Sequence, residues 1–306
     1  MKILFLTDIH LRSLSDRPKW RLDEHYTTQF DELHEVKELA KINKVDLILC
    51  GGDLFHTAVG SHSLLTDLMT WLKSLPCSFY SVQGNHDIHA FQLTDTNNAL
   101  NVLFESGLVE KLDEVVFEKD KVLIRGIPAY LNPKEGNYIF EEKWKDYYKI
   151  IVSHNYISKV PQIFDCYLTK DIVTNANLVL SGHLHQGFSD IQGNTQFINP
   201  SSIARWASNE THQPQILILD TNTRQIKRIE LGCSKKAEYI FDIESIREIK
   251  STEMNLQNFV QSLEGASFEN VDIENVVLTK GKEQGILKEI LDICLDKVSK
   301  AKEELR

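Results

Sequence analysis

Short apolar runs alternate with helical stretches in the N-terminal part of the chain. Each run is rich in branched and aromatic residues and leads into a turn that carries polar residues. Strands that alternate with helices in this way predict βαβ units and a mostly parallel, buried sheet. The expected strands are Lys2–Thr7, Asp46–Cys50 and Phe79–Val82, and the expected helices are Phe30–Ile42, Leu64–Leu75 and Asn97–Glu105.

After residue 115 the pattern becomes dominated by strands. The runs Val115–Glu118 and Val122–Gly126 lie close together and indicate a β-hairpin. Together with the N-terminal pattern, the later runs predict an α/β fold with two packed sheets and helices outside, a four-layer α/β/β/α sandwich. These later runs are Lys149–Ser153, Leu178–Ser181, Thr195–Ile198, Gln215–Asp220 and Gln225–Glu230.

The composition changes after the stretch Gly232–Lys236, and we expect a domain boundary there. A large domain would then comprise residues 1–232, and a small α+β domain would comprise residues 237–306. The elements expected in the small domain are a strand at Glu238–Ile243, a helix at Leu256–Leu263, a strand at Val271–Leu278 and a helix at Glu283–Glu304.

The composition indicates a globular protein of the cytoplasm. Of 306 residues, 42% are hydrophobic and 25% are charged, and no stretch approaches the roughly 20 apolar residues of a membrane span. We interpret the start of the chain as a strand rather than a signal peptide. The five cysteines form no CxxC pair, which favours a reducing compartment.

The net charge of −10 bears on the partners of the protein. A protein that binds nucleic acid through its phosphates is expected to show a basic face. The overall charge shows no such excess and favours smaller phosphate compounds over a polyanion.

Polar side chains with metal-binding chemistry follow the predicted strands. Residues at the carboxyl ends of strands in an α/β sheet line one crevice, so groups distant in sequence converge there. One motif alone would fit a surface turn, but five such motifs in order predict a single site. The residues are Asp8 and His10, Asp53, Asn85 with His86 and Asp87, His154, and His183 with His185.

These residue types suit a pair of divalent ions. Imidazole nitrogen together with carboxylate oxygen favours Mn, Fe or Zn over Mg or Ca alone. In Asp8-Ile9-His10 and His183-Leu184-His185, alternate residues of an extended segment point the same way. The carboxylate of Asp53 has two oxygens and can bridge ions about 3.5–4 Å apart.

The ordered set resembles the calcineurin-like metallophosphoesterase superfamily over residues 1–220. The resemblance implies one metal ion held by Asp8, His10, Asp53 and His185, and a second held by Asp53, Asn85, His154 and His183. It also implies a bridging water or hydroxide as the nucleophile. His86 is a ligand in neither set, and we expect it to protonate or stabilise the leaving oxygen, with Asp87 available to orient its ring. A supporting role without proton transfer is the alternative for His86.

Further motifs resemble the SbcD and meiotic-recombination-eleven nuclease branch of that superfamily. The stretch Gly52-Asp53-Leu54-Phe55-His56 matches the GDLFH of these nucleases, where the histidine helps to position the DNA phosphate. The segment Asn199–Arg205 resembles the NPGS segment of the branch and its trailing arginine, with Ser201 where a glycine is usual. The small C-terminal domain occupies the place of the DNA-capping domain of these nucleases.

The resemblance predicts an Mn²⁺-dependent DNA nuclease with exonuclease and endonuclease action, working with an SMC-like ATPase of the SbcC type. The apolar stripe of the last helix would bind that ATPase or pack on its own domain. A homodimer through the helix at Leu64–Leu75 is a further expectation, although these leucines suit core packing equally well. The alternative function is a small-molecule phosphoesterase acting on nucleotides or cyclic nucleotides.

Overall fold

The computed structural model describes residues 1–18, 20–89, 97–133, 136–207, 210–242, 245, 277–279, 281, 291–292 and 294–298. The chain divides into two compact units, Met1–Phe241 and Asp242–Arg306. Nearly all described residues lie in the first unit, which contains the site. Among the described helices, none is long and apolar enough to cross a bilayer.

The first sheet has six strands in the order β14-β13-β1-β2-β3-β4. Strands β1 to β4 are parallel, and β13 joins β1 antiparallel at the other side, with Ile3 opposite Leu219. The bounds are β1 Lys2–Leu6, β2 Leu47–Cys50, β3 Ser78–Ser81, β4 Glu110–Lys111, β13 Gln215–Asp220 and β14 Gln225–Glu230.

The second sheet also has six strands, in the order β11-β12-β10-β7-β6-β5. Its four central strands are parallel, and antiparallel β11 and β5 close its two edges. The bounds are β5 Glu114–Phe117, β6 Val122–Ile127, β7 Tyr148–Ser153, β10 Leu178–Ser181, β11 Phe188–Gln192 and β12 Thr195–Asn199. The expected hairpin is confirmed as the β5–β6 pair.

Alternate residues of the strands face two different cores, as the two-residue period of a strand requires. Ile3 and Phe5 of β1 pack with Ile150 and Val152 of β7 in the core between the sheets. Their neighbours in β1, such as Leu4, pack instead against the helices. Because both faces of the central strands are buried, these strands read as continuous apolar runs in the sequence.

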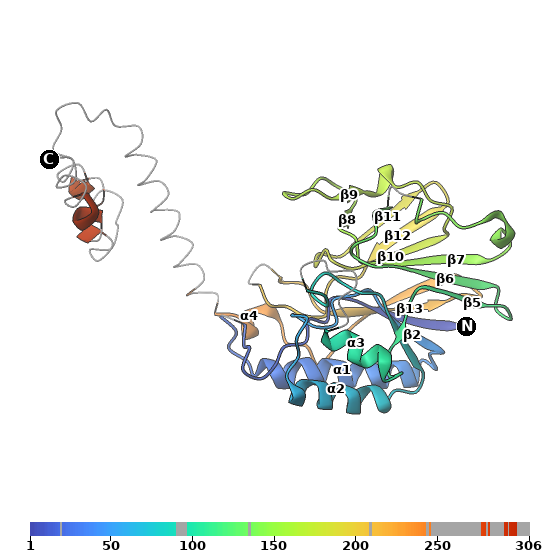
Figure 1. Ribbon diagram of the computed structural model, residues 1–306, viewed down its shortest axis with the longest axis horizontal. Coiled ribbons are helices and arrows are strands. Elements are labelled where there is room, and N and C mark those ends of the chain that lie inside the picture. The colour runs from blue at the N-terminus through green and yellow to red at the C-terminus, as the bar shows by residue number, and fades with distance from the viewer. Residues whose placement is uncertain are drawn as a thin grey trace. The chain divides into compact units, whose positions relative to one another are not determined.

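Three helices cover the outer face of the first sheet (Figure 1): α1 His25–Ile42, α2 His62–Lys73 and α3 Ala99–Glu105. The second sheet is covered differently in the described residues. Its outer apolar cluster contains Tyr138, Phe140 and Trp144. The covering segments include the 3-10 helices η2 Glu142–Trp144 and η3 Thr169–Asp171 and the short strand pair β8 Ile157–Ser158 and β9 Tyr167–Leu168.

The α/β fold with two packed sheets is confirmed, and most strand bounds agree with the expected ones to within a residue. The strand expected at Glu238–Ile243 is wrong, because α4 Ala237–Ile240 is a helical turn. Val277 and Leu278, expected at the end of a strand, are helical too. The expected helix at Leu256–Leu263 and most of residues 237–306 lie outside the described residues.

Candidate metal centre

The predicted site residues lie at the carboxyl ends of β1, β2, β3, β7 and β10, all of which run parallel to a neighbour. Backbone hydrogen bonds join the loop after β1 to the loop after β2. Asp8 N donates to Gly52 O at 3.1 Å, and His10 N donates to Asp53 O at 2.9 Å. Asp8, His10, Asp53 and His183 all have positive φ, between 45° and 70°. Such strained conformations concentrate at functional sites, where the surrounding structure enforces them.

Asp8, His10 and His185 form the first group of potential ligands. Their ligand atoms lie within 4.8 Å of one another. The Nε2 atoms of His10 and His185 face each other at 3.0 Å, and Asp8 Oδ1 lies 3.9 Å from the first and 3.8 Å from the second. The Asp8 carboxylate is oriented by Thr7 Oγ1 and by the backbone N–H of His183.

Asp53, His154 and His183 form the second group, again within 4.8 Å. The Nδ1 of His154 lies 2.6 Å from the carbonyl of Gly51, which leaves Nε2 turned toward the group. Asn85 belongs to it by position, because its Oδ1 lies 3.2 Å from His154 Nε2 and 2.8 Å from His183 Nδ1.

Asp53 lies between the two groups. Its Oδ2 is 3.5 Å from His10 Nε2 and 3.1 Å from His154 Nε2. Its Oδ1 accepts a hydrogen bond from the backbone N–H of His86 at 2.8 Å. One carboxylate oxygen therefore faces potential ligands of both groups at once.

The charge of the site fits divalent cations. Asp8 and Asp53 are buried, and no Lys or Arg among the described residues pairs with either carboxylate. Burial alone would raise the pKa of Asp53, but the imidazoles of His154 and His10 hold it well below its usual value. Although burial opposes it, the Asp53 carboxylate raises the pKa of His154 to about 10. A buried carboxylate that attracts positive charge as strongly as Asp53 does matches the demand of a metal site.

Glycine at position 84 is required by the close approach of two loops. A Cβ there would lie 2.0 Å from Asp53 Oδ1 and 2.3 Å from Asp53 N. The loop after β3 therefore reaches the Asp53 carboxylate only because residue 84 has no side chain.

His86 lies beside the first group, with its ring centroid 4.8 Å from that of His10. Its Nδ1 is 2.7 Å from the carbonyl of His56. The expectation that Asp87 orients this ring is wrong, because the Asp87 oxygens instead accept hydrogen bonds from the backbone N–H groups of Phe55 and Gly84. Asp87 thus joins the loops after β2 and β3, and the His56 carbonyl takes the orienting position.

His56 is also at the site, with its ring 5.2 Å from His86 in a stacked arrangement. Nitrogen atoms of His10, His56 and His86 approach within 4.8 Å of one another. The Nε2 of His56 lies 2.6 Å from Nη2 of Arg12. Burial, followed by the Arg12 charge, lowers the pKa of His56 to about 4. His56 is therefore a neutral imidazole.

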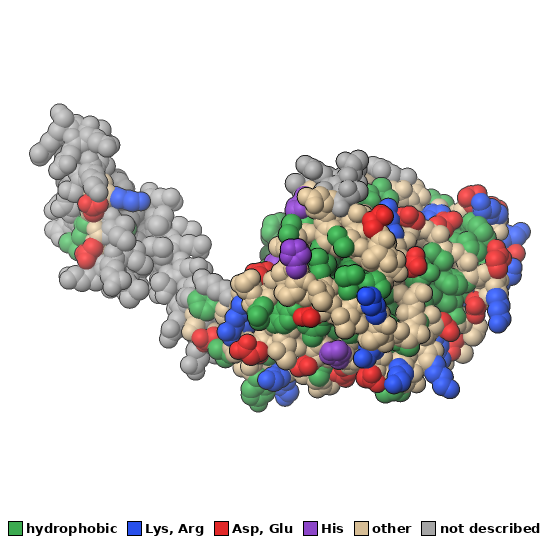
Figure 2. Space-filling model, turned by 60° about the horizontal axis from the view of Figure 1, so that its bottom comes forward, with side chains coloured by type: hydrophobic (Ala, Val, Ile, Leu, Met, Phe, Trp, Pro, Cys, Tyr) green, Lys and Arg blue, Asp and Glu red, His purple; other side chains and the backbone are tan. Residues whose placement is uncertain are grey.

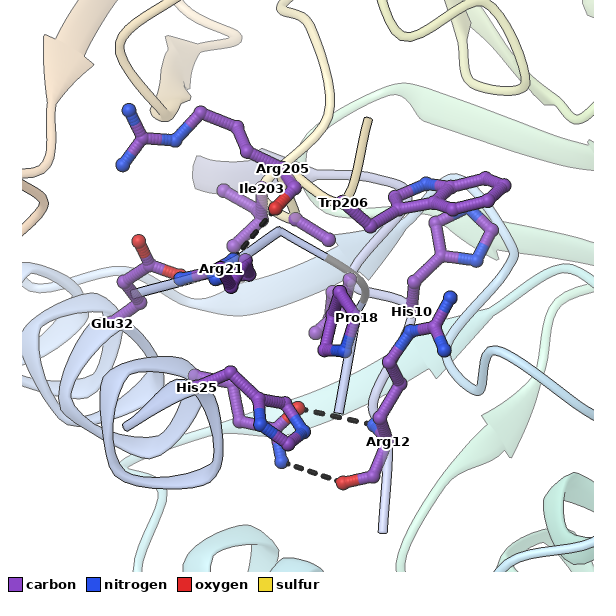
Figure 3. Close-up of a pocket in the computed structure, with 12 residues that line it drawn as sticks. His10, Arg12, Pro18, Arg21, His25, Glu32, Ile203, Arg205 and Trp206 are labelled. Atoms are coloured by element: carbon purple, nitrogen blue, oxygen red, sulfur yellow. Dashed lines mark hydrogen bonds between the residues drawn. The ribbon is translucent and has the colours of Figure 1, made fainter. Parts of the chain in front are cut away.

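Three further residues at the site lie outside the predicted motifs. The Trp206 indole lies 4.8 Å from the His56 ring and 5.9 Å from the His10 ring, and the Arg12 guanidinium lies 5.4 Å from its centroid. Figure 3 shows Arg12 extending toward Trp206 and His10. Glu210 is hydrogen-bonded to Nδ1 of His185.

Arg205, the expected trailing arginine, does not reach the metal groups. It is buried, and its guanidinium donates to the carbonyls of Lys235 and His212. In Figure 3 this guanidinium points away from His10. Ser201 has φ +85°, in the region that favours glycine.

A groove of about 260 Å³ adjoins the second group. Asn85, His154 and His183 form one part of its lining, and tyrosines form another. The Tyr156 ring lies 5.1 Å from the His183 ring, edge to face. The lining tyrosines are Tyr130, Tyr156 and Tyr167.

The arrangement offers two adjoining groups of potential metal ligands on an α/β fold with two packed sheets. The model of the calcineurin-like phosphoesterase family matches residues 1–187, and the chain belongs to that family. The expected superfamily is thereby confirmed.

One relative belongs to the meiotic-recombination-eleven branch that the GDLFH motif indicated. It is the double-strand break repair protein MRE11 of Encephalitozoon cuniculi, 24% identical over 264 residues. The match covers 72% of this chain and 45% of the relative, so the chain spans less than half of that protein.

Two solved structures resemble this chain. Each match extends over 100% of the solved chain and 76% of this chain. One is a novel archaeal phosphodiesterase, with 17% identity and a TM-score of 0.40. The other is Yfce, a phosphoesterase from E. coli, with 14% identity and a TM-score of 0.37.

Proposed function

We propose that the chain is a two-metal phosphodiesterase that cleaves DNA. One ion would be held by Asp8, His10, Asp53 and His185, and the second by Asp53, Asn85, His154 and His183. The observation that carries the proposal is the position of Asp53 Oδ2 between His10 Nε2 at 3.5 Å and His154 Nε2 at 3.1 Å. Such a shared carboxylate is what a pair of ions needs.

The residues of the chain then have distinct tasks. Divalent ions at these imidazole and carboxylate ligands, Mn²⁺ in our proposal, would supply charge for the phosphoryl oxygens and lower the pKa of water. The His56 carbonyl accepts the Nδ1–H of His86, so the doubly protonated ring would carry a second proton at Nε2 and give it to the leaving oxygen. His56, stacked on His86, would help to position the substrate phosphate.

DNA is the substrate that the groove and the sequence motifs support best. Tyrosine faces beside the metal groups suit nucleobases, since stacking on aromatic side chains binds bases without regard to sequence. The GDLFH match and the similarity to an MRE11 protein support the same choice.

The test is cleavage of single- and double-stranded DNA by the purified chain with Mn²⁺, Mg²⁺ or no metal. We expect cleavage with Mn²⁺ and none without metal. His86→Ala should lower kcat by about 10²–10⁴-fold, the range of general acid catalysis, with metal binding unchanged. His34→Ala, at an exposed histidine of α1, is the matched control and should keep full activity. Full activity of His86→Ala would remove this residue from the mechanism.

A small-molecule phosphoesterase is the second candidate, favoured by the net charge of −10. On the face that Figure 2 shows, Lys and Arg are interspersed with Asp and Glu. DNA binding should weaken steeply with rising salt if DNA is the substrate, because the contacts release counterions. Good turnover of nucleotides or cyclic nucleotides without DNA cleavage would favour the second candidate instead.

The partners follow from the same proposal. Residues 237–306 would form a capping or partner-binding domain, and an SMC-like ATPase would use it as a docking site. Nuclease assays with and without such an ATPase, and the molar mass of the chain in solution, test the partner and the homodimer.

A further inference from the structure

The carboxylate of Glu210 connects a predicted metal ligand to the loop that carries Trp206. Its Oε1 is hydrogen-bonded to His185 Nδ1. Its Oε2 accepts hydrogen bonds from the backbone N–H groups of Trp206 at 2.6 Å and Ala207 at 3.0 Å. The Glu210 side chain is 9% exposed, so these hydrogen bonds are shielded from water.

The contact with His185 determines which ring nitrogen faces the site. A carboxylate accepts hydrogen bonds, so His185 donates from Nδ1. Its Nε2 then carries the lone pair in the neutral ring, and this atom lies 3.0 Å from His10 Nε2 and 3.8 Å from Asp8 Oδ1. A carboxylate behind a ligating histidine fixes both the tautomer and the ring orientation.

The contact with the loop places the Trp206 indole against the histidines. The indole lies 6.0 Å from the His185 ring and 5.9 Å from the His10 ring. Figure 3 shows it beside His10. The Glu210 side chain therefore sets the position of the potential ligand His185 and of the Trp206 indole next to it.

Glu210 is not placed to bind the metal itself. The His185 ring lies between it and the first group, since Nδ1 faces Glu210 and Nε2 faces His10 and Asp8. Both Glu210 oxygens already accept hydrogen bonds.

We propose that Glu210 is a positioning residue that presents Nε2 of His185 to the ion at Asp8 and His10 and holds Trp206 against the same histidines. This inference rests on the proposed metal assignment. It assigns a role at the metal centre to Glu210, a residue outside the predicted motifs.

The experiment compares Mn²⁺ binding to the full chain and to Glu210→Ala and Glu210→Gln by calorimetry. We expect Glu210→Ala to weaken one of two Mn²⁺ sites by about 10–100-fold, the range for such supporting carboxylates. Glu210→Gln, which keeps an accepting oxygen without the charge, should show a smaller loss. Unchanged affinity at both sites in Glu210→Ala would overturn the inference.

Glu35→Ala is the matched control for a purely structural effect. The Glu35 carboxylate also accepts two backbone N–H groups, those of Gly232 and Cys233 at 2.8 Å each, but it joins α1 to a loop away from the histidines. A loss of Mn²⁺ affinity as large in this variant as in Glu210→Ala would show that loop anchoring alone is responsible, and would contradict the inference.

A second readout needs no metal. In ¹⁵N spectra of histidine-labelled chain, assigned with His185→Gln, His185 should be protonated at Nδ1 in the wild type and lose this preference in Glu210→Ala. If the wild type binds no Mn²⁺, the proposed function fails while this tautomer still tests Glu210. A tautomer unchanged by Glu210→Ala would overturn the inference.

Discussion

At the scale of single residues, Arg12 determines how His56 can act. A guanidinium only donates hydrogen bonds, so His56 must accept at Nε2, which lies 2.6 Å from Arg12 Nη2. The proton of the neutral His56 ring is then on Nδ1, an atom that is buried and has no hydrogen-bond partner among the described protein groups. Arg12 thus fixes the tautomer and the orientation of the His56 ring beside His86.

Replacement of Arg12 should therefore impair DNA cleavage. We expect Arg12→Met to lower kcat/KM by about 10–100-fold, in line with the roughly 1.5–3 kcal/mol of a charged hydrogen bond. Arg12→Lys should recover part of the loss. The measurement is DNA cleavage with saturating Mn²⁺, and Arg17→Met, at an exposed arginine of the same loop, is the control. Equal rates for Arg12→Met and wild type would show that His56 needs no such partner.

Sequence patterns could predict the ligands but not the residues that hold them. Asp8 and Asp53 follow apolar strands within recognisable motifs, so their convergence follows from the topology. Arg12, Trp206 and Glu210 lie in segments without periodicity, and only the folded chain shows that they meet the histidines. Asp87, expected to orient His86, instead joins two loops because its carboxylate accepts hydrogen bonds from the backbone N–H groups of Phe55 and Gly84.

At the scale of elements, the site depends on how closely the loops after β2 and β3 approach each other. Gly84→Ala would place a methyl group 2.0 Å from Asp53 Oδ1, which forces one loop to move. We expect this variant to lose Mn²⁺ binding and to unfold at lower urea concentration than the wild type.

The matched control for this prediction is Gly60→Ala. An added Cβ at Gly60 meets its nearest atom, in the Phe55 ring, at 3.5 Å, an ordinary contact. Calorimetry with Mn²⁺ and urea unfolding on both variants provide the comparison. Normal Mn²⁺ affinity in Gly84→Ala would mean that the two loops are not held as closely as the structure shows.

The apolar runs predicted most strands because burial on both faces leaves a continuous signal. The antiparallel edge strand β11 was missed, since the polar residues Ser189, Asp190 and Gln192 interrupt its apolar pattern. The outer cover of the second sheet could not be predicted either. It depends on long-range contacts of Tyr138 and Phe140 in segments without helical periodicity.

At the scale of the whole molecule, a buried carboxyl group makes the stability of the first unit depend on pH. Glu32 of α1 accepts a hydrogen bond from Ser234 at 2.6 Å. Ser234 lies near the C-terminal end of the same unit, Met1–Phe241. Burial raises the pKa of Glu32 to about 7, although Ser234 and the Arg205 charge act against it. The folded chain therefore binds a proton on Glu32 that the unfolded chain, with an ordinary carboxyl, releases at lower pH.

The sign of the effect follows from this difference in bound protons. Between the unfolded pKa of 4.5 and the folded pKa of about 7 the folded state binds more protons, so the free energy of unfolding falls as pH rises. The shift corresponds to about 3 kcal/mol. Glu32→Gln keeps an acceptor for Ser234 and cannot ionise, so its stability should fall less over this interval. Urea unfolding at pH 5, 6, 7 and 8 provides the measurement, and parallel pH profiles for the two proteins would mean that Glu32 titrates normally in the folded chain.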